Sequence, residues 1–183
     1  MTDLSVLLEN ARKGDRAAID ELFIVLYRDL RQLAHSRLRD ARSLTMLGTT
    51  ALVHESYLRF VKARAIAVES RPQFMAYAAR VMRSVIVDLA RGRSADRRGG
   101  GIPDVTLDAG QDEPVADGVE EILKVNDALD TLARIDARLV SIVELRYFGG
   151  LSDVEIADSL GVTDRTVRRD WKKARLLLAA ALG

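Results

Sequence analysis

The side chains in this sequence that could do chemistry are hydroxyls and cations. Thr49 and Thr50 stand where a predicted helix begins, a place where Asp or Glu usually complements the helix dipole. A threonine there can cap the helix, or it can carry a phosphate, which adds about −1.5 to −2 charge. The chain has no cysteine, and its two histidines, His35 and His54, are not in a metal-ligand spacing. We therefore expect no metal site, no cofactor and no catalytic residues.

A second group of chemically active side chains lies in LSDVEIADSLGVTDRTVRRDWKKARLLL, residues 151–178. Ser152-x-x-Glu155 is a capping box, Gly161 permits a tight turn, and Thr163 can cap a following helix. This spacing predicts a helix-turn-helix, whose second helix enters the major groove of DNA. The cations expected on its exposed face are Arg165, Arg168, Arg169, Lys172 and Lys173. A plain helical hairpin with a solvated charged face is the alternative.

The rest of the chain reads as helical. Apolar residues recur at helical spacing from 4 to 11 and from 19 to 33, and again from about Thr49 to Arg64. Ser70-Arg71-Pro72-Gln73 is a second good helix start, with Phe74 and Tyr77 expected in the core behind it. Two more helices are expected around Ile122–Leu132 and Leu139–Phe148. In the helix-turn-helix we expect Val154, Ile156, Ala157 and Leu160 to be buried, and Trp171 to be a core residue.

A break in composition divides the chain. Residues 99–118, GGGIPDVTLDAGQDEPVADG, hold five Gly, two of the three Pro, five acids and no base, which predicts a mobile linker. Residues 1–98 have 18 Lys/Arg against 11 Asp/Glu, and residues 119–183 have 10 against 11. The fold class predicted is all-α, with two small helical domains, 1–98 and 119–183, joined by a flexible linker.

The location of the protein is also suggested by its composition. The N-terminus has no apolar stretch of signal-peptide length, and the longest apolar run, residues 176–182, is too short to cross a bilayer. We expect a cytoplasmic protein with no membrane partner.

Three segments in order resemble bacterial sigma factors of the extracytoplasmic-function (ECF) type. ALVHESYLRFVK (51–62) resembles the core-polymerase-binding helix, RPQFMAYAARVMRSVIVDLARGR (71–93) resembles the helix that reads and melts the −10 element, and residues 144–175 resemble the −35-reading region 4. The resemblance implies region 2 at 1–98 and region 4 at 119–183. It also implies promoter DNA and core RNA polymerase as partners, with region 2 on the β′ clamp helices and region 4 on the β flap.

The resemblance carries DNA-binding roles to particular residues. In region 4 these are the five cations named above. In region 2 they are the polar residues of the 70–93 helix and the arginines that follow it, with the loop from about Ala65 to Ser70 forming a pocket for an unstacked base. The region 2 candidates are Arg80, Arg83, Ser84, Arg91, Arg93, Arg97 and Arg98.

The expected polymerase-binding residues are Thr49, Thr50, Glu55 and Arg59. Most ECF sigma factors carry an acidic cluster where this chain has Gly48-Thr49-Thr50-Ala51, and that cluster pairs with basic residues of the β′ clamp helices. A phosphate on Thr50, or next on Thr49, would supply the missing charge at a helix N-terminus. Some ECF-like groups without the cluster are paired with Ser/Thr kinases, so a Ser/Thr protein kinase is a further expected partner. The resemblance also leaves room for an anti-sigma factor.

Two other classes of protein compete with this interpretation. A helix-turn-helix regulator that acts without polymerase would bind duplex DNA alone, whereas a free sigma factor does so poorly. An enzyme would need acid–base pairs or a phosphate loop after a strand, and neither is evident. We therefore predict a promoter-specific initiation factor that is not an enzyme.

Overall fold

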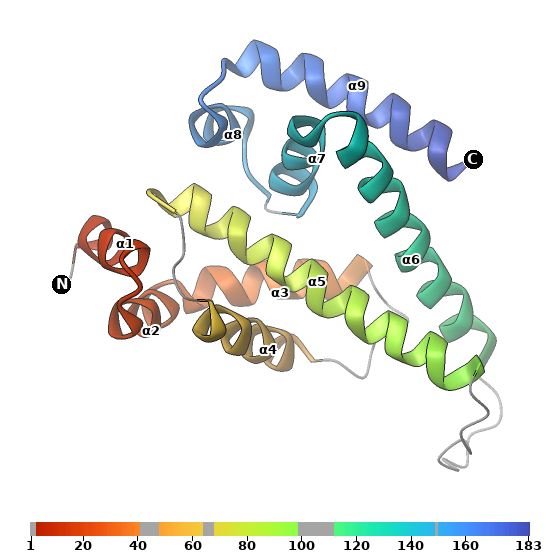
Figure 1. Ribbon diagram of the computed structural model, residues 1–183, viewed down its shortest axis with the longest axis horizontal. Coiled ribbons are helices and arrows are strands. Elements are labelled where there is room, and N and C mark those ends of the chain that lie inside the picture. Colours follow the sequence, from red (N-terminus) through yellow and green to blue (C-terminus); the bar gives the residue numbers. More distant parts are fainter. Residues whose placement is uncertain (1–2, 41–47, 64–67, 99–111, 149) are drawn as a thin grey trace.

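The computed structural model describes residues 3–40, 48–63, 68–98, 112–148 and 150–183. These residues form nine α-helices and one π-helical segment and contain no strand, which confirms the all-α prediction. Helices α1 to α5 make a lower layer in Figure 1, helices α7 to α9 make an upper layer, and α6 runs between the two along one side. Of the linker expected at residues 99–118, the part from 99 to 111 lies outside the described residues.

The first three helices are α1 (Leu4–Arg12), α2 (Arg16–Val25) and α3 (Tyr27–Asp40). Asp3 and Asp15 cap α1 and α2 by accepting hydrogen bonds from backbone N–H groups of the first turn. The sequence predicted one helix through 19–33, but the helix breaks at Leu26. Leu26 and Leu30 stay buried while Ile24 is 76% exposed, so the apolar stripe changes direction there. Packing of α3 across α4 and α5 accounts for the bend that periodicity alone did not show.

Helices α4 (Thr49–Lys62) and α5 (Arg71–Arg98) complete the lower layer. The Ser70 hydroxyl accepts a hydrogen bond from the Gln73 N–H at 3.3 Å, as predicted for a helix start, while the Gln73 side chain accepts from Glu69 N–H instead of from Ser70. Phe74 is fully buried, and its ring stacks on that of Phe60 with centroids 5.7 Å apart. Phe74 is therefore a core residue, as expected.

Two helices lead into the upper layer. α6 (Asp112–Ile135) begins inside the segment expected to be linker. The helix opens with two acids and Pro114, and both acids and proline favour helix starts. α7 (Ala137–Val143), capped by Asp136, continues as the π-helical η2 (Glu144–Phe148). Gly150 follows with φ of 66°, the conformation that suits glycine at a helix end.

The predicted helix-turn-helix is present as α8 (Asp153–Leu160) and α9 (Asp164–Leu182). Ser152 and Glu155 form the capping box, Gly161 has φ of 64°, and the Thr163 side chain caps α9 by accepting from Thr166 N–H. Val154, expected in the core, is 61% exposed, which is a correction. A helix of eight residues has room for one buried face only, and Ile156 and Ala157 lie on it.

Trp171 packs against two apolar clusters at once. One, which we call the η2–α8–α9 cluster, is built mainly from those elements and also includes Ile142 of α7, and the other is built from α6, α7 and α9 and includes Leu139. The guanidinium carbon of Arg146 lies 4.8 Å from the centroid of the ring. Trp171 is only partly buried, but it packs against both clusters and so joins the parts of the upper layer.

The two layers also touch. Ala76 of α5 is buried among the residues of the η2–α8–α9 cluster, and Val119 of α6 is buried in the core of the lower layer. Helix α5 therefore packs against α3 and α4 in the lower layer and also contacts η2 and α8 of the upper layer (Figure 1). Among the described helices, none combines the length and the apolar character that crossing a membrane requires.

Candidate DNA and polymerase interfaces

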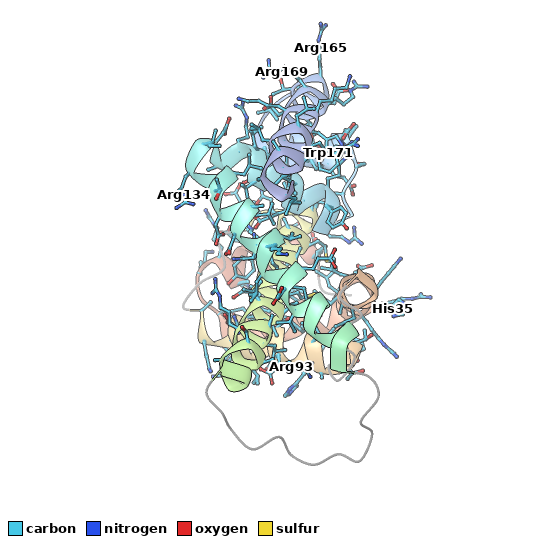
Figure 2. The ribbon with its side chains drawn as sticks, turned by 90° about the vertical axis from the view of Figure 1, so that its right-hand side faces the viewer. His35, Arg93, Arg134, Arg165, Arg169 and Trp171 are labelled. Atoms are coloured by element: carbon cyan, nitrogen blue, oxygen red, sulfur yellow. The ribbon has the colours of Figure 1, made fainter. Side chains whose placement is uncertain are left out.

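The cations of α9 form an exposed face. Arg165, Arg168, Arg169, Lys172 and Lys173 are all exposed, as predicted. Figure 2 shows Arg165 and Arg169 projecting at the tip of the molecule, far from Arg93 at the opposite end. Arg168 pairs with Asp164 one turn before it. The side chains of this face are therefore accessible from solvent in the structure.

The buried carboxylate of Asp170 links the cationic face of α9 to helix α7. It is almost fully buried, and it accepts a hydrogen bond from Arg138 Nε at 2.9 Å and another from Arg169 Nε at 3.0 Å. A buried carboxylate needs such partners, because an unpaired charge away from water is costly. Asp170 thereby ties α9 to the start of α7 and occupies the guanidinium of Arg169.

The predicted −10-reading residues of α5 are placed differently. The side chain of Arg83 is only 15% exposed and faces α6 and η2. Its Nη1 donates to Glu144 Oε1 at 2.6 Å, and its Nη2 donates to Asn126 Oδ1 at 2.7 Å and to Asp130 Oδ1 at 3.3 Å. Arg80 is half-exposed, with its Nε 3.8 Å from Glu144 Oε2. We call these five residues the interlayer cluster.

Glu144 is the acid at the centre of the interlayer cluster. Its side chain is 10% exposed. Burial raises the pKa of Glu144 above its ordinary value, and the charges of Arg83 and Arg80 act in the opposite direction. Asn126 Nδ2 donates to Asp130 Oδ2 at 3.0 Å, so the acceptors around Arg83 are themselves held in place.

Arg59 and Ser84, which were predicted to contact polymerase and DNA respectively, are hydrogen-bonded to each other. Arg59, expected at the polymerase interface, donates to Ser84 Oγ at 2.6 Å and to Asp88 Oδ2 at 2.7 Å. Ser84, expected to contact DNA, thus accepts a hydrogen bond from a side chain of α4. These bonds fix α4 against α5, and Tyr57 Oη adds a bond from α4 to Asp20 of α2 at 2.9 Å.

The remaining arginines lie towards the far end of α5. Arg91 is exposed and lies 4.0 Å from Asp88, and Arg93 is half-buried. The side chains of Arg97 and Arg98 lie outside the described residues. The pocket-forming loop expected near residues 65–70 is described only from Val68 onward.

The two threonines open α4 but do not cap it. Gly48 is the N-cap residue, it makes no side-chain cap bond, and the first turn holds no acid. Thr50 is exposed, whereas Thr49 is half-buried and lines a shallow groove with Arg28, Arg31 and His35 of α3. The capping role considered for these threonines from the sequence is therefore wrong. Glu55, one turn further along α4, is exposed.

Sequence reasoning did not find the acceptors of Arg83 or the cations beside Thr49. Glu144, Asn126 and Asp130 lie 43 to 61 residues from Arg83 in the chain, and no local pattern links them. Arg28 and Arg31 look like ordinary solvated positions of an amphipathic helix. Only the net positive charge of residues 1–98 hinted at a surplus of cations there.

A helix-turn-helix with a cationic, exposed second helix, packed beside a helical bundle, is typical of DNA-binding proteins. The sequence matches the family model described as ECF sigma factor over residues 1–183. The chain belongs to this family, whose members are regulatory factors that direct promoter-specific transcription initiation by RNA polymerase. A comparison with curated proteins gives no match.

Proposed function

We propose that this sigma factor uses α4 to bind core RNA polymerase, α5 to bind the −10 element and α9 to bind the −35 element, and that phosphorylation at the start of α4 licenses polymerase binding. In this assignment region 2 comprises residues 1–98 and region 4 comprises residues 119–183. The exposed cations of α9 support the −35 role, because phosphate and base contacts both need accessible donors.

The observation that carries the phosphorylation proposal is the first turn of α4. It has no acid and no side-chain cap bond, so within the described residues of α4 nothing negative offsets its first N–H groups and the positive end of the dipole. A phosphate there would be favoured by both. The family resemblance gives the same position to an acidic cluster, so a phosphate would restore the charge that this chain lacks.

The two threonines are not equivalent as acceptors of the phosphate. A phosphate on Thr49 would share its groove with Arg28, Arg31 and His35, which would neutralise part of its charge. A phosphate on Thr50 would face solvent, where basic residues of the polymerase could reach it. Thr50 is therefore the preferred licensing site. A Ser/Thr protein kinase is the partner that this requires, and an anti-sigma factor is a further candidate regulator.

The test is the affinity of the full chain for purified core RNA polymerase. Protein with phosphothreonine incorporated at position 50 is compared with unmodified protein and with protein phosphorylated at position 49. We expect modification at position 50 to tighten binding at least about tenfold, the effect of one to three charge-assisted hydrogen bonds. Thr50→Glu should tighten it less, because a carboxylate carries less charge.

The control is Thr131→Glu, which adds the same charge on the exposed surface of α6. It should leave polymerase affinity unchanged. Equal, tight binding by unmodified and phosphorylated protein would refute the licensing step and leave the sigma function standing. If no form binds the polymerase, the proposed role of α4 is wrong.

A further inference from the structure

Asp170 is a charged residue on the buried side of α9, the second helix of the helix-turn-helix. The buried residues of this helix are Val167, Asp170 and Ala174, which follow one another at helical spacing. Such a stripe normally holds apolar side chains, because a helix packs its apolar face against the core. A carboxylate therefore stands at a position where the pattern of the helix calls for an apolar residue.

Stability alone does not account for this carboxylate. Replacing a buried ion pair by apolar side chains is often neutral or stabilising, because removing charges from water costs much of what their attraction returns. Both cationic partners of Asp170, Arg138 and Arg169, are themselves partly exposed and can reach water without it. What the carboxylate adds is a fixed orientation of these two guanidinium groups.

The two arginines are bound by different oxygens of Asp170. Arg138 Nε donates to Oδ2 at 2.9 Å, and Arg138 Nη2 lies 2.9 Å from the same oxygen. Arg138 is in turn fixed at the start of α7, where its N–H donates to the capping residue Asp136. Arg169 Nε donates to Oδ1 of Asp170 at 3.0 Å. The carboxylate is thus held by α7 and itself holds the exposed guanidinium of Arg169.

The bond to Arg169 uses only the inner nitrogen of its guanidinium. The two terminal Nη groups remain as a planar pair of donors, on a side chain that is 70% exposed. A planar pair of donors matches two neighbouring acceptors on one base edge in the major groove. Arg168 differs, because one of its Nη groups is paired with Asp164, an exposed carboxylate that fixes a side chain only weakly.

We propose that Asp170 is a positioning residue for DNA recognition, which holds Arg169 so that its two Nη groups read a base edge of the −35 element. The proposal rests on the −35 role proposed for α9. A side chain that is oriented in advance loses less conformational entropy on binding and accepts a narrower range of geometries. A base edge with the wrong groups then leaves the donors unpaired, and that penalty discriminates between base pairs.

Arg165 provides the contrast on the same face of α9. It lies at the same end of the molecule as Arg169 (Figure 2), but its side chain makes no bond to another described residue. An unconstrained cation suits a phosphate, and a phosphate contact carries no sequence information. The structure therefore separates two roles: Arg169 contributes sequence discrimination, and Arg165 contributes affinity.

The test uses the full chain assembled with core RNA polymerase. The wild-type complex first selects a preferred sequence from promoter DNA in which the −35 element is randomised. Its affinity for the selected duplex is then compared with its affinity for every single-base variant of that duplex, and each ratio measures discrimination at one base pair. The same measurements are made on Arg169→Ala, on two Asp170 variants, on each of those combined with Arg169→Ala, and on Arg165→Ala as the matched loss of charge.

The two Asp170 variants are Asp170→Leu and Asp170→Ala. One fills the buried site and the other leaves it open, so an effect that both share comes from the lost carboxylate. Both should fold, because Arg138 and Arg169 are partly exposed and neither becomes a buried, unpaired charge. The melting temperature of each variant checks this, and one folded variant is enough for the test.

We expect Arg169→Ala to reduce discrimination at least about fivefold at one or two adjacent base pairs, the lower end of the effect of a bidentate base contact. Loss of the Asp170 carboxylate should reduce discrimination at the same base pairs. The combined variant should discriminate no worse than Arg169→Ala alone, because Asp170 acts through Arg169. Arg165→Ala should weaken binding to all the duplexes by one common factor.

Additive losses in the combined variant would overturn the proposal, because Asp170 would then act through the packing of α9 as a whole. Full discrimination in a folded Asp170 variant would overturn it too, as would a loss at base pairs that Arg169→Ala leaves unchanged. A wild-type complex that selects no −35 sequence would refute the −35 role of α9 and this inference with it. Selection by wild type followed by any of the other results leaves the −35 role standing.

Discussion

Glu155 stabilises the start of the helix-turn-helix through its charge. One of its carboxylate oxygens accepts from the Ser152 N–H at 2.9 Å and from the Ser152 hydroxyl at 2.8 Å. These bonds lower the pKa of Glu155 below its ordinary value, the backbone bond being the larger cause. The capping box is therefore a small, pH-dependent contribution to stability.

The sign of that dependence follows from linkage. The unfolded chain binds a proton at Glu155 at higher pH than the folded chain, so the contribution is complete above the unfolded pKa of about 4.3 and disappears as the pH falls through the lower folded value. We expect the difference in melting temperature between wild type and Glu155→Gln to shrink over that range. Thermal unfolding followed by circular dichroism from pH 7 to 3 measures it. The same shrinkage in Glu121→Gln, an exposed position on α6, would contradict this prediction.

At the scale of single elements, replacing glycine by alanine should change the stability of the protein in opposite directions at two positions. Gly161 has φ of 64° at the end of α8, where a Cβ is strained although space is free, so Gly161→Ala should cost about 1 kcal/mol. Gly92 lies inside the helix α5 with nothing within 4 Å of an added Cβ, so Gly92→Ala should stabilise by about 0.5–1 kcal/mol. The melting temperature should move in opposite directions, by about 2–4 °C per kcal/mol. A shift of the same sign in both variants would refute the argument.

The individual helices also show which structural features could be predicted from the sequence alone. Ser152, Gly161 and Thr163 are signals that act within a few residues, and the structure confirms all three. The break at Leu26 and the exposure of Val154 were not predicted, because both depend on which neighbouring helix covers the apolar stripe. The exposure of the α9 cations followed from helical periodicity, whereas the burial of Arg83 depends on residues far away in the chain.

In the whole molecule, the labelled arginines of α9, Arg165 and Arg169, lie at one end, Arg93 of α5 lies towards the other, and Arg134 of α6 lies between them (Figure 2). The cations on α9 are exposed, and the proposed −35 role makes them the residues expected to contact phosphates when the sigma factor is bound to the polymerase. Arg165→Ala should weaken binding to duplex DNA and reduce the slope of log affinity against log salt by about 1. Fluorescence anisotropy at several salt concentrations measures this. Arg134→Ala, which removes the same charge from the exposed surface of α6, should leave the slope unchanged, and an equal loss there would mean that only net charge matters.

The placement of Trp171 has a practical consequence for following these changes. It is the only tryptophan of the chain, and it lies where α9 meets both upper clusters, next to the guanidinium of Arg146. Indole emission excited at the red edge would therefore come from one ring in one place. The wavelength and intensity of this emission would report loosening of the helix-turn-helix, whereas changes confined to α1 to α5 would not be detected.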